Sequence, residues 1–363
     1  MKQTSQHRTL YLIICCCLMA VVLLVWPRAE RAQQPAVKTA DQVYKNIQVF
    51  KKLPASELDQ TMAFIAGSLG VKCNHCHTNP WEKDDKLQKQ TARRMIQMVF
   101  DLNKGSFAGE NGVTCFTCHR GKPIPVSVPA VGQNLWAPGP AAAKEEALPT
   151  VDEVLAKYVE ATGGAATLKK VTTRVTKGSR IGADNVLVPE EVFQKAPNKL
   201  MTITSYPNAV LTSAYNGSEA WGKSGTAGIR DLPEGLVAML KVDADFYREL
   251  RTKESYAKLT LTGKENVRDS DAWVIAATPA HGSMEKLFFD VRSGLLVRRY
   301  TESDTIFGKF PLQTDYEDYR DVDGIKLPFL IHWSMPGRIW GRKIAEIKQN
   351  VPVDDAQFDR PKN

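Results

Sequence analysis

Two short motifs in the first third of the sequence contain residue types that can do chemistry. The pattern Cys-x-x-Cys-His occurs at residues 73–77 and again at residues 115–119. Two thiols one helical turn apart reach the two vinyl groups at one edge of a porphyrin, and the adjacent histidine can then bind the iron. The motifs therefore predict two covalently bound c-type haems, with attachment through Cys73, Cys76, Cys115 and Cys118 and iron ligation by His77 and His119.

Chance and other metal chemistry explain these motifs less well. A chain with seven cysteines and six histidines contains one such motif by chance on the order of a few thousandths of a time. One zinc ion bound by two cysteine pairs leaves both adjacent histidines without a role. A redox dithiol needs only one pair, usually in a βαβ unit. Haem attachment is the interpretation that uses both cysteines and the final histidine of each motif.

Each iron also needs a sixth ligand or an open site. Between residues 30 and 130 the one histidine outside the two ligand positions is His75, which lies within a motif and cannot easily reach the opposite face of a haem. The same stretch contains three methionines, Met62, Met95 and Met98. A methionine on a helical stripe is usually core packing, but here two irons lack partners. We therefore expect Met62 to bind the first iron and prefer Met95 over Met98 for the second.

Helical stretches lead into the first motif. Apolar residues at helical spacing predict a short helix over residues 43–50 and a longer one over residues 58–69, which Gly70 ends. Ser56 and Asp59 resemble a capping box at the start of the longer helix. The longer helix therefore delivers the chain directly to the first cysteine.

The second motif has a helix of its own. An apolar stripe over residues 87–102 is closed by Gly105 and precedes the motif in the same way. Two copies of helix, turn and motif predict an all-α dihaem c-type cytochrome domain over residues 40–125.

The chain begins with a segment typical of export. Lys2 and Arg8 precede an unbroken apolar run from Leu10 to Trp26. The run is just long enough to span a bilayer, and a small-x-small cleavage site is poorly formed. Residues 1–32 are therefore predicted to be a signal peptide or, by preference, a retained N-terminal membrane anchor, with their three cysteines as apolar filler. We expect a periplasmic protein that is exported across the cytoplasmic membrane of a bacterium and, if residues 1–32 are retained, anchored in it.

Composition and charge exclude some classes of protein and partner for this chain. Apolar residues at 43% and charged residues at 24% are normal for a soluble globular protein. The formal net charge of +8 suggests an acidic partner or an anionic surface, but lysine and arginine are scattered, so no nucleic acid is expected as a partner. No cysteine follows Cys118, which excludes a disulfide framework from the second half.

The second half changes character. Residues 126–149 are Pro/Ala-rich and contain few large apolar residues, which predicts a linker. Thr150 then caps a helix that Gly163-Gly164 breaks. Alternating apolar stretches separated by turn signals follow. Residues 150–361 are therefore predicted to form an α+β domain with an antiparallel sheet and a few helices.

Some polar residues of the second half invite a catalytic interpretation. Arg320, Asp321 and Asp323 are better explained as a charged turn between strands. His281 and His332 are interpreted as a surface-loop residue and a strand residue, and not as haem ligands.

The residues around the motifs resemble a known family. Residues 62–77, 91–98 and 113–121, together with Asn103, are similar to the multihaem cytochrome c subunit of photosynthetic reaction centres. The likeness covers about one half of that four-haem subunit. It implies a unit of helix, haem, helix and haem with thioether cysteines, proximal histidines and mostly methionine distal ligands, of which Met62 is one.

The second half has a weaker resemblance. Residues 294–298, 315–324, 327–329 and 350–355, with Phe358, are similar to proteins that carry and sort outer-membrane lipoproteins. That likeness implies a half-open β-barrel around an apolar cavity, with a lipid or lipoprotein as its ligand.

The sequence thus predicts a multidomain protein, in which an all-α dihaem cytochrome domain precedes an α+β domain with a curved antiparallel sheet. We expect an electron carrier and not an enzyme, with redox proteins or a membrane electron-transfer complex as partners and membrane contact through the N-terminus. One alternative is a haem enzyme, a peroxidase or reductase, with one open iron site. Another is an apolar-ligand-binding module whose haems sense redox state.

Overall fold

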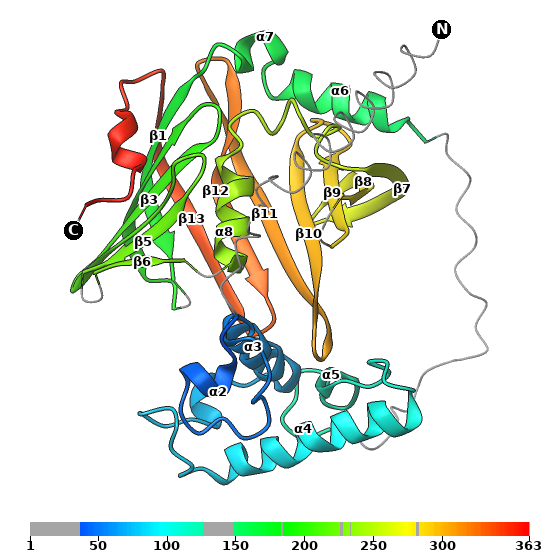
Figure 1. Ribbon diagram of the computed structural model, residues 1–363. Helices are drawn as coiled ribbons and strands as arrows, with labels where there is room; N and C mark the ends of the chain where they lie inside the picture. The colour runs from blue at the N-terminus through cyan, green and yellow to red at the C-terminus, as the bar shows by residue number, and fades with distance from the viewer. Residues whose placement is uncertain are drawn as a thin grey trace, which may run out of the picture. The chain divides into compact units, whose positions relative to one another are not determined.

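A computed structural model describes residues 37–125, 148–182, 184–225, 228–232, 234–280 and 283–362, the side chains at 234 and 235 excepted (Figure 1). The expected export segment at 1–32 lies outside the described residues, as does the expected linker as far as residue 147. The chain divides into the units Met1–Lys38 and Thr39–Asn363, and every element below belongs to the second. Among the described residues, none of the helices combines the length and apolar character needed to cross a bilayer.

Residues 39–125, called the helical segment here, contain short and long helices and one isolated β-bridge. The elements are α2 (Ala40–Val43), η1 (Ala55–Glu57), α3 (Leu58–Leu69), η2 (Cys73–His75), α4 (Leu87–Ser106) and α5 (Cys115–His119).

The prediction of a helix over residues 43–50 is wrong. α2 ends at Val43, and Tyr44 is already extended, with φ −114° and ψ 149°. Asn46 takes a left-handed φ of 58°, and its side-chain amide donates hydrogen bonds to the Glu82 carbonyl oxygen and the Asp84 carboxylate. Tertiary hydrogen bonds therefore override the helical spacing of the apolar residues.

The two longer helices agree better with the sequence. α3 has the expected bounds, and Gly70 ends it with φ 66°, a conformation in which a Cβ would lie 2.1 Å from the carbonyl oxygen of Gly121. The capping box expected at Ser56 and Asp59 is not formed, because η1 leads directly into the helix. α4 runs through Gly105 and ends one residue later.

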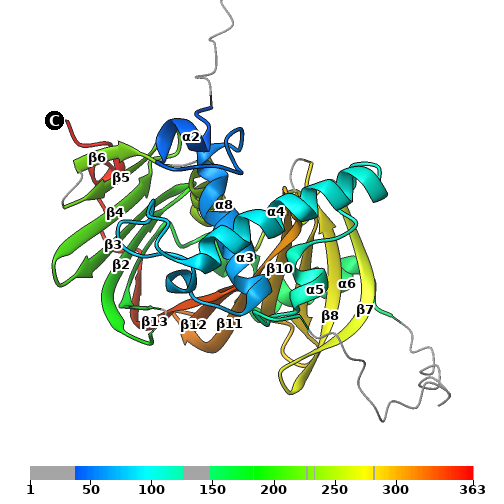
Figure 2. The ribbon, with the colours of Figure 1, turned by 90° about the horizontal axis from the view of Figure 1, so that it is seen from below.

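In residues 150–361, called the sheet segment, the described residues form one antiparallel sheet of 13 strands. The expected curved antiparallel sheet is confirmed, and both views show its strands curving around α8 (Figures 1 and 2). The sheet is open, with β6 and β7 at its edges. The strands are β1 (Thr173–Ile181), β2 (Leu187–Lys195), β3 (Lys199–Tyr206), β4 (Ala209–Tyr215), β5 (Ala220–Ser224), β6 (Gly228–Asp231), β7 (Lys258–Val267), β8 (Ser270–Thr278), β9 (Glu285–Asp290), β10 (Leu296–Thr305), β11 (Gly308–Val322), β12 (Ile325–Met335) and β13 (Arg338–Gln349).

Helices accompany the sheet. They are α6 (Val151–Ala161), α7 (Ala165–Leu168), α8 (Glu234–Ala244) and η3 (Asp355–Phe358). The side chain of Thr150 accepts a hydrogen bond from the backbone N–H of Glu153, so the expected cap of α6 is confirmed. Gly163 follows with φ 124°, and a Cβ there would lie 2.2 Å from the Gly324 carbonyl oxygen. Glycine is therefore required where α6 ends against the β11–β12 turn.

The core of the helical segment includes residues from the sheet segment. Phe307, between β10 and β11, is 1% exposed. Its ring centroid lies 5.9 Å from that of Phe50, 5.7 Å from that of Phe64 and 5.6 Å from that of Phe100. Phe310 is buried in the same cluster. The β10–β11 hairpin therefore completes the packing around α3 and α4.

Candidate haem-binding site

The first motif lies in a tight turn after α3. The backbone N–H of Cys76 and that of His77 both donate to the carbonyl oxygen of Cys73, at 3.3 and 3.0 Å. This single helical turn separates the two thiols, as the haem interpretation requires. Cys73 is exposed, whereas Cys76 and His77 are half-buried.

The second motif forms α5, which packs against α3. The side chain of Asn103 is buried at the end of α4 and makes two hydrogen bonds to the backbone of Val113, at 2.9 and 3.0 Å. The hydroxyl of Thr114 then accepts from the backbone N–H of Thr117 and caps α5. After α5, the N–H of Gly121 donates to the Ser68 carbonyl oxygen at 2.9 Å, which ties the end of the motif to α3.

None of the four motif cysteines forms a disulfide. Burial raises the pKa of the Cys115 thiol to about 11 and also raises that of Cys76. Among the described residues, no three His, Cys, Asp or Glu side chains are gathered as a metal site. The structure thus does not bring the two cysteine pairs together around one point, as the zinc alternative would need.

Both motif histidines are oriented in the same way. The Nδ1 of His77 lies 3.1 Å from the carbonyl oxygen of Trp81, and the Nδ1 of His119 lies 2.9 Å from that of Lys122. A carbonyl oxygen can only accept a hydrogen bond, so each Nδ1 carries the proton. The Nε2 atom of each ring is left with its lone pair, which is the form of histidine that binds iron. The residues present therefore fit a haem at both motifs.

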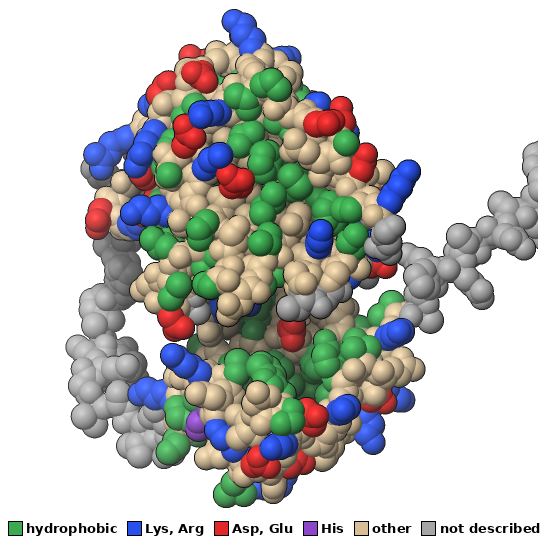
Figure 3. Space-filling view, turned by 90° about the vertical axis from the view of Figure 1, so that its left-hand side faces the viewer, with side chains coloured by type: hydrophobic (Ala, Val, Ile, Leu, Met, Phe, Trp, Pro, Cys, Tyr) green, Lys and Arg blue, Asp and Glu red, His purple; other side chains and the backbone are tan. Residues whose placement is uncertain are grey.

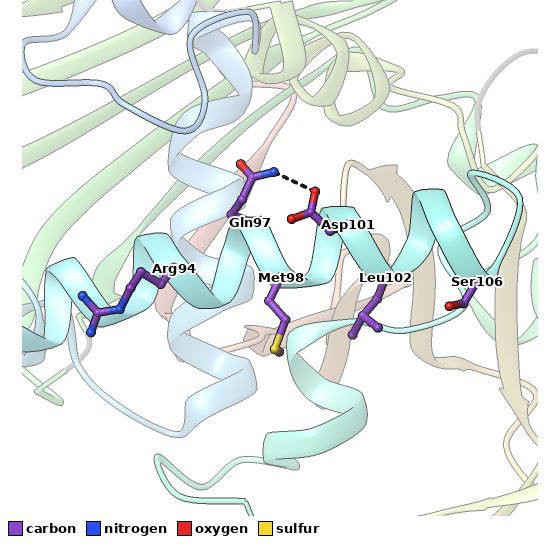
Figure 4. Close-up of a pocket in the computed structure, with 6 residues that line it drawn as sticks. All are labelled: Arg94, Gln97, Met98, Asp101, Leu102 and Ser106. Carbon is purple, nitrogen blue, oxygen red and sulfur yellow. Dashed lines mark hydrogen bonds between the residues drawn. The ribbon is translucent and has the colours of Figure 1, made fainter.

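The candidate methionines differ in their surroundings. Met62 is half-buried on α3 and packs against the aromatic core. Met95 is half-buried on α4, whereas Met98, one turn later, is 40% exposed. Figure 4 shows Met98 and Leu102 pointing to the same side of α4. They line a pocket of about 490 Å³ with Arg94, Gln97, Asp101 and Ser106. Met98 and not Met95 is in the lining of this pocket.

Of the remaining polar residues that the structure describes, those of the second half lie in the sheet segment. His332 is on β12, with its Nδ1 3.2 Å from a carboxylate oxygen of Glu317, and His281 is outside the described residues. The carboxylate of Asp321 accepts a hydrogen bond from the backbone N–H of Gly324 at 3.0 Å, as in a turn. His75 is half-buried within the first motif.

One residue near the first motif was not expected from the sequence. Lys89 is 9% exposed on α4, and its ammonium donates to the carbonyl oxygens of Trp81 and Lys83 at 2.9 and 2.7 Å. It also lies 3.1 Å from the carboxylate of Asp84. The sequence offered one signal for this residue. Lys89 lies in the first turn of a helix, where a cation is unfavourable, and no acidic residue accompanies it in that turn.

Comparison with known proteins supports the resemblance of the first half. The model of the family described as "Photosynthetic reaction centre cytochrome C subunit" matches residues 20–163. The photosynthetic reaction center cytochrome c subunit of Thermochromatium tepidum is 41% identical over 91 residues, which cover 24% of this chain and 22% of that protein. The subunit of Rubrivivax gelatinosus is 39% identical over 101 residues, or 26% and 28% of the two chains. The chain thus spans about a quarter of these relatives' length.

Both relatives are named as cytochrome c subunits. Among solved structures, a LolA superfamily protein from Nitrosomonas europaea is similar, with 14% identity and a TM-score of 0.41 over 59% of this chain and 99% of that one.

Proposed function

We propose that this chain is a dihaem c-type cytochrome that transfers electrons outside the cytoplasmic membrane. In this proposal residues 40–125 are the haem domain, residues 126–149 are a linker and residues 150–361 are a second domain that docks a partner or a lipid. Residues 1–32 export the chain or anchor it. The similarity of the first half to cytochrome subunits supports the haem domain.

The observation that carries the proposal is the matched orientation of two histidines. In both motifs the Nδ1–H donates to a backbone carbonyl three or four residues later, and Nε2 remains available. Such a hydrogen bond fixes the tautomer and the ring orientation of a histidine that binds a metal. Cys73, Cys76, Cys115 and Cys118 are the proposed thioether residues, with His77 and His119 as iron ligands.

Methionine ligands would suit a carrier. A thioether ligand would raise the potential of a bound haem, and a histidine together with a methionine would leave no open position for substrate. Met62 is proposed for the first iron. For the second, the sequence favours Met95, whereas the pocket beside α4 favours Met98, and substitution of each by histidine distinguishes them. The bound haem would supply the one-electron chemistry.

Exposed residues beside the motifs suit exchange of electrons with another protein. Cys73 and Cys118 are exposed, and Trp81, 60% exposed, stacks on His77 with ring centroids 5.4 Å apart. Positive and negative side chains are scattered over the face in Figure 3, so this face gives no support to a nucleic-acid partner.

Haem content tests the proposal. After expression with export and haem-attachment machinery, the purified chain should retain two haems through acid-acetone extraction. Cys76→Ala and Cys118→Ala should each weaken or abolish one attachment, because each removes one of two thioether bonds. Extraction of all haem from the intact protein would contradict the proposal.

A cavity in the sheet segment supports the docking role of the second domain. It has a volume of about 950 Å³, within the usual range for ligand pockets. Its lining combines Leu240, Phe289 and Trp333 with Arg174, whose Nε has no hydrogen-bond partner. An amphiphile could satisfy both the apolar wall and the guanidinium. Solvent extraction of the purified protein followed by mass spectrometry should therefore recover a stoichiometric lipid, and its absence from protein made in the native host would contradict this role.

A further inference from the structure

The carbonyl oxygen of Trp81 accepts hydrogen bonds from two donors. The Nδ1–H of His77 reaches it at 3.1 Å, and the ammonium of Lys89 reaches it at 2.9 Å. The side chain of Lys89 is only 11% exposed. A buried positive charge and a motif histidine therefore share one backbone oxygen.

The position of Lys89 is electrostatically unusual. It lies in the first turn of α4, where the helix dipole repels a cation, and that turn has no acidic residue. Its burial is compensated by the carbonyl oxygens of Trp81 and Lys83 and by the carboxylate of Asp84. These contacts hold the loop that follows the first motif and fix the oxygen that His77 faces.

The second motif provides a built-in comparison. The Nδ1 of His119 faces the carbonyl oxygen of Lys122 at 2.9 Å. Within the part of the chain that the structure describes, no lysine ammonium donates to that oxygen. Both histidines thus donate to a backbone carbonyl oxygen, but only the oxygen that His77 faces also accepts from a lysine ammonium.

We propose that Lys89 is a positioning residue that raises the reduction potential of the haem held by residues 73–77; this rests on the proposed haem function. A strong hydrogen bond from Nδ1–H makes a histidine a more basic ligand, which favours ferric iron. The ammonium draws electron density from the shared oxygen and weakens that bond. Its buried charge also disfavours the extra positive charge of ferric iron. Both effects favour the ferrous state of the first haem, and neither acts on the second.

Equilibrium redox titration of the full-length dihaem protein tests this role. Lys89→Met should lower the ratio of reduced to oxidised first haem at least tenfold at a fixed ambient potential, which is about 59 mV for a one-electron couple. The second haem should not change. Lys89→Arg keeps the charge and the donors, so it should retain most of the wild-type potential.

A matched control separates the shared hydrogen bond from loss of charge alone. Lys83→Met removes an exposed lysine of the same loop. In this variant the ratio of reduced to oxidised haem at the fixed potential should change by less than a factor of two for each haem. Lys89→Gln, which keeps a neutral donor, serves if the methionine variant does not fold, and it should also lower the first potential.

Unchanged potentials in Lys89→Met or Lys89→Gln would overturn the inference, as would an equal shift in Lys83→Met or in Lys89→Arg. The haem count of the same samples distinguishes the two proposals. Fewer than two covalent haems in the wild-type protein would refute the proposed function, whereas two haems with unmoved potentials would refute only the role of Lys89.

Discussion

Replacing Phe307 by alanine should destabilise the helical segment, although Phe307 belongs to the hairpin between β10 and β11. The side chain is 1% exposed and lies within 6 Å of three other aromatic rings, centroid to centroid. Removal of a buried phenylalanine costs about 3–5 kcal/mol, because the transfer free energy is lost and a cavity remains.

The aromatic packing places the expected loss of unfolding free energy near the middle of that range or above it. Each aromatic pair adds about 0.5–1.5 kcal/mol beyond the buried area, and Phe307 takes part in contacts with Phe50, Phe64 and Phe100. A loss of about 4 kcal/mol corresponds to a fall in melting temperature of about 6 °C when the unit Thr39–Asn363 unfolds as a whole, at an unfolding entropy of about 2.1 cal/mol/K per residue.

Thermal unfolding of the holoprotein, followed by haem absorbance and by far-ultraviolet circular dichroism, measures this effect. Phe107→Ala is a matched control, since Phe107 is 40% exposed and its loss should lower the melting temperature much less. An unchanged haem transition in Phe307→Ala would refute the reasoning. A destabilisation seen only in the circular dichroism of the strands, and not in the haem absorbance, would also refute it, because the hairpin would then not complete the core around α3.

Two further substitutions have directional outcomes. Met62→His should lower the potential of one haem and abolish the weak far-red absorption of ferric methionine-ligated haem, because thioether sulfur favours ferrous iron; unchanged potentials would show that Met62 is only packing. The hydrogen bond from Arg93, then those from Asn46 and Lys89, lower the pKa of Asp84 well below its ordinary 3.8. That carboxylate therefore stabilises the fold above pH 3.8, and the contribution is lost as the pH falls toward its folded pKa. Asp84→Asn should flatten the acid limb of the urea-unfolding profile, and an unaltered acid limb would contradict this.

The sequence was most informative where local chemistry determines the outcome. α3 has the expected bounds because an apolar stripe and a C-terminal glycine define it. The cap at Thr150 forms as expected, since the capping pattern involves only neighbouring residues. The period-two alternation likewise predicted the antiparallel sheet, whose neighbouring strands are mostly consecutive in the chain.

Tertiary contacts account for what the sequence did not predict. The expected helix over residues 43–50 is absent because Asn46 bonds to a loop more than thirty residues away. Phe307 is one apolar residue in a hairpin turn, and its burial depends on a partner that the sequence does not identify. The burial of Lys89 was not predicted, because its acceptors are backbone oxygens of a loop that the sequence pattern does not place beside it.

The central claim is that two haems are attached covalently at residues 73–77 and 115–119. Intact mass spectrometry of the denatured, purified protein tests it most directly, with the iron porphyrin quantified by its pyridine haemochrome spectrum. We expect a mass increase of two haems per chain, which falls to one haem when Cys73 and Cys76 are both replaced by alanine and the second motif is left intact. A mass without added haem, from cells that attach haem to a control cytochrome, would contradict it.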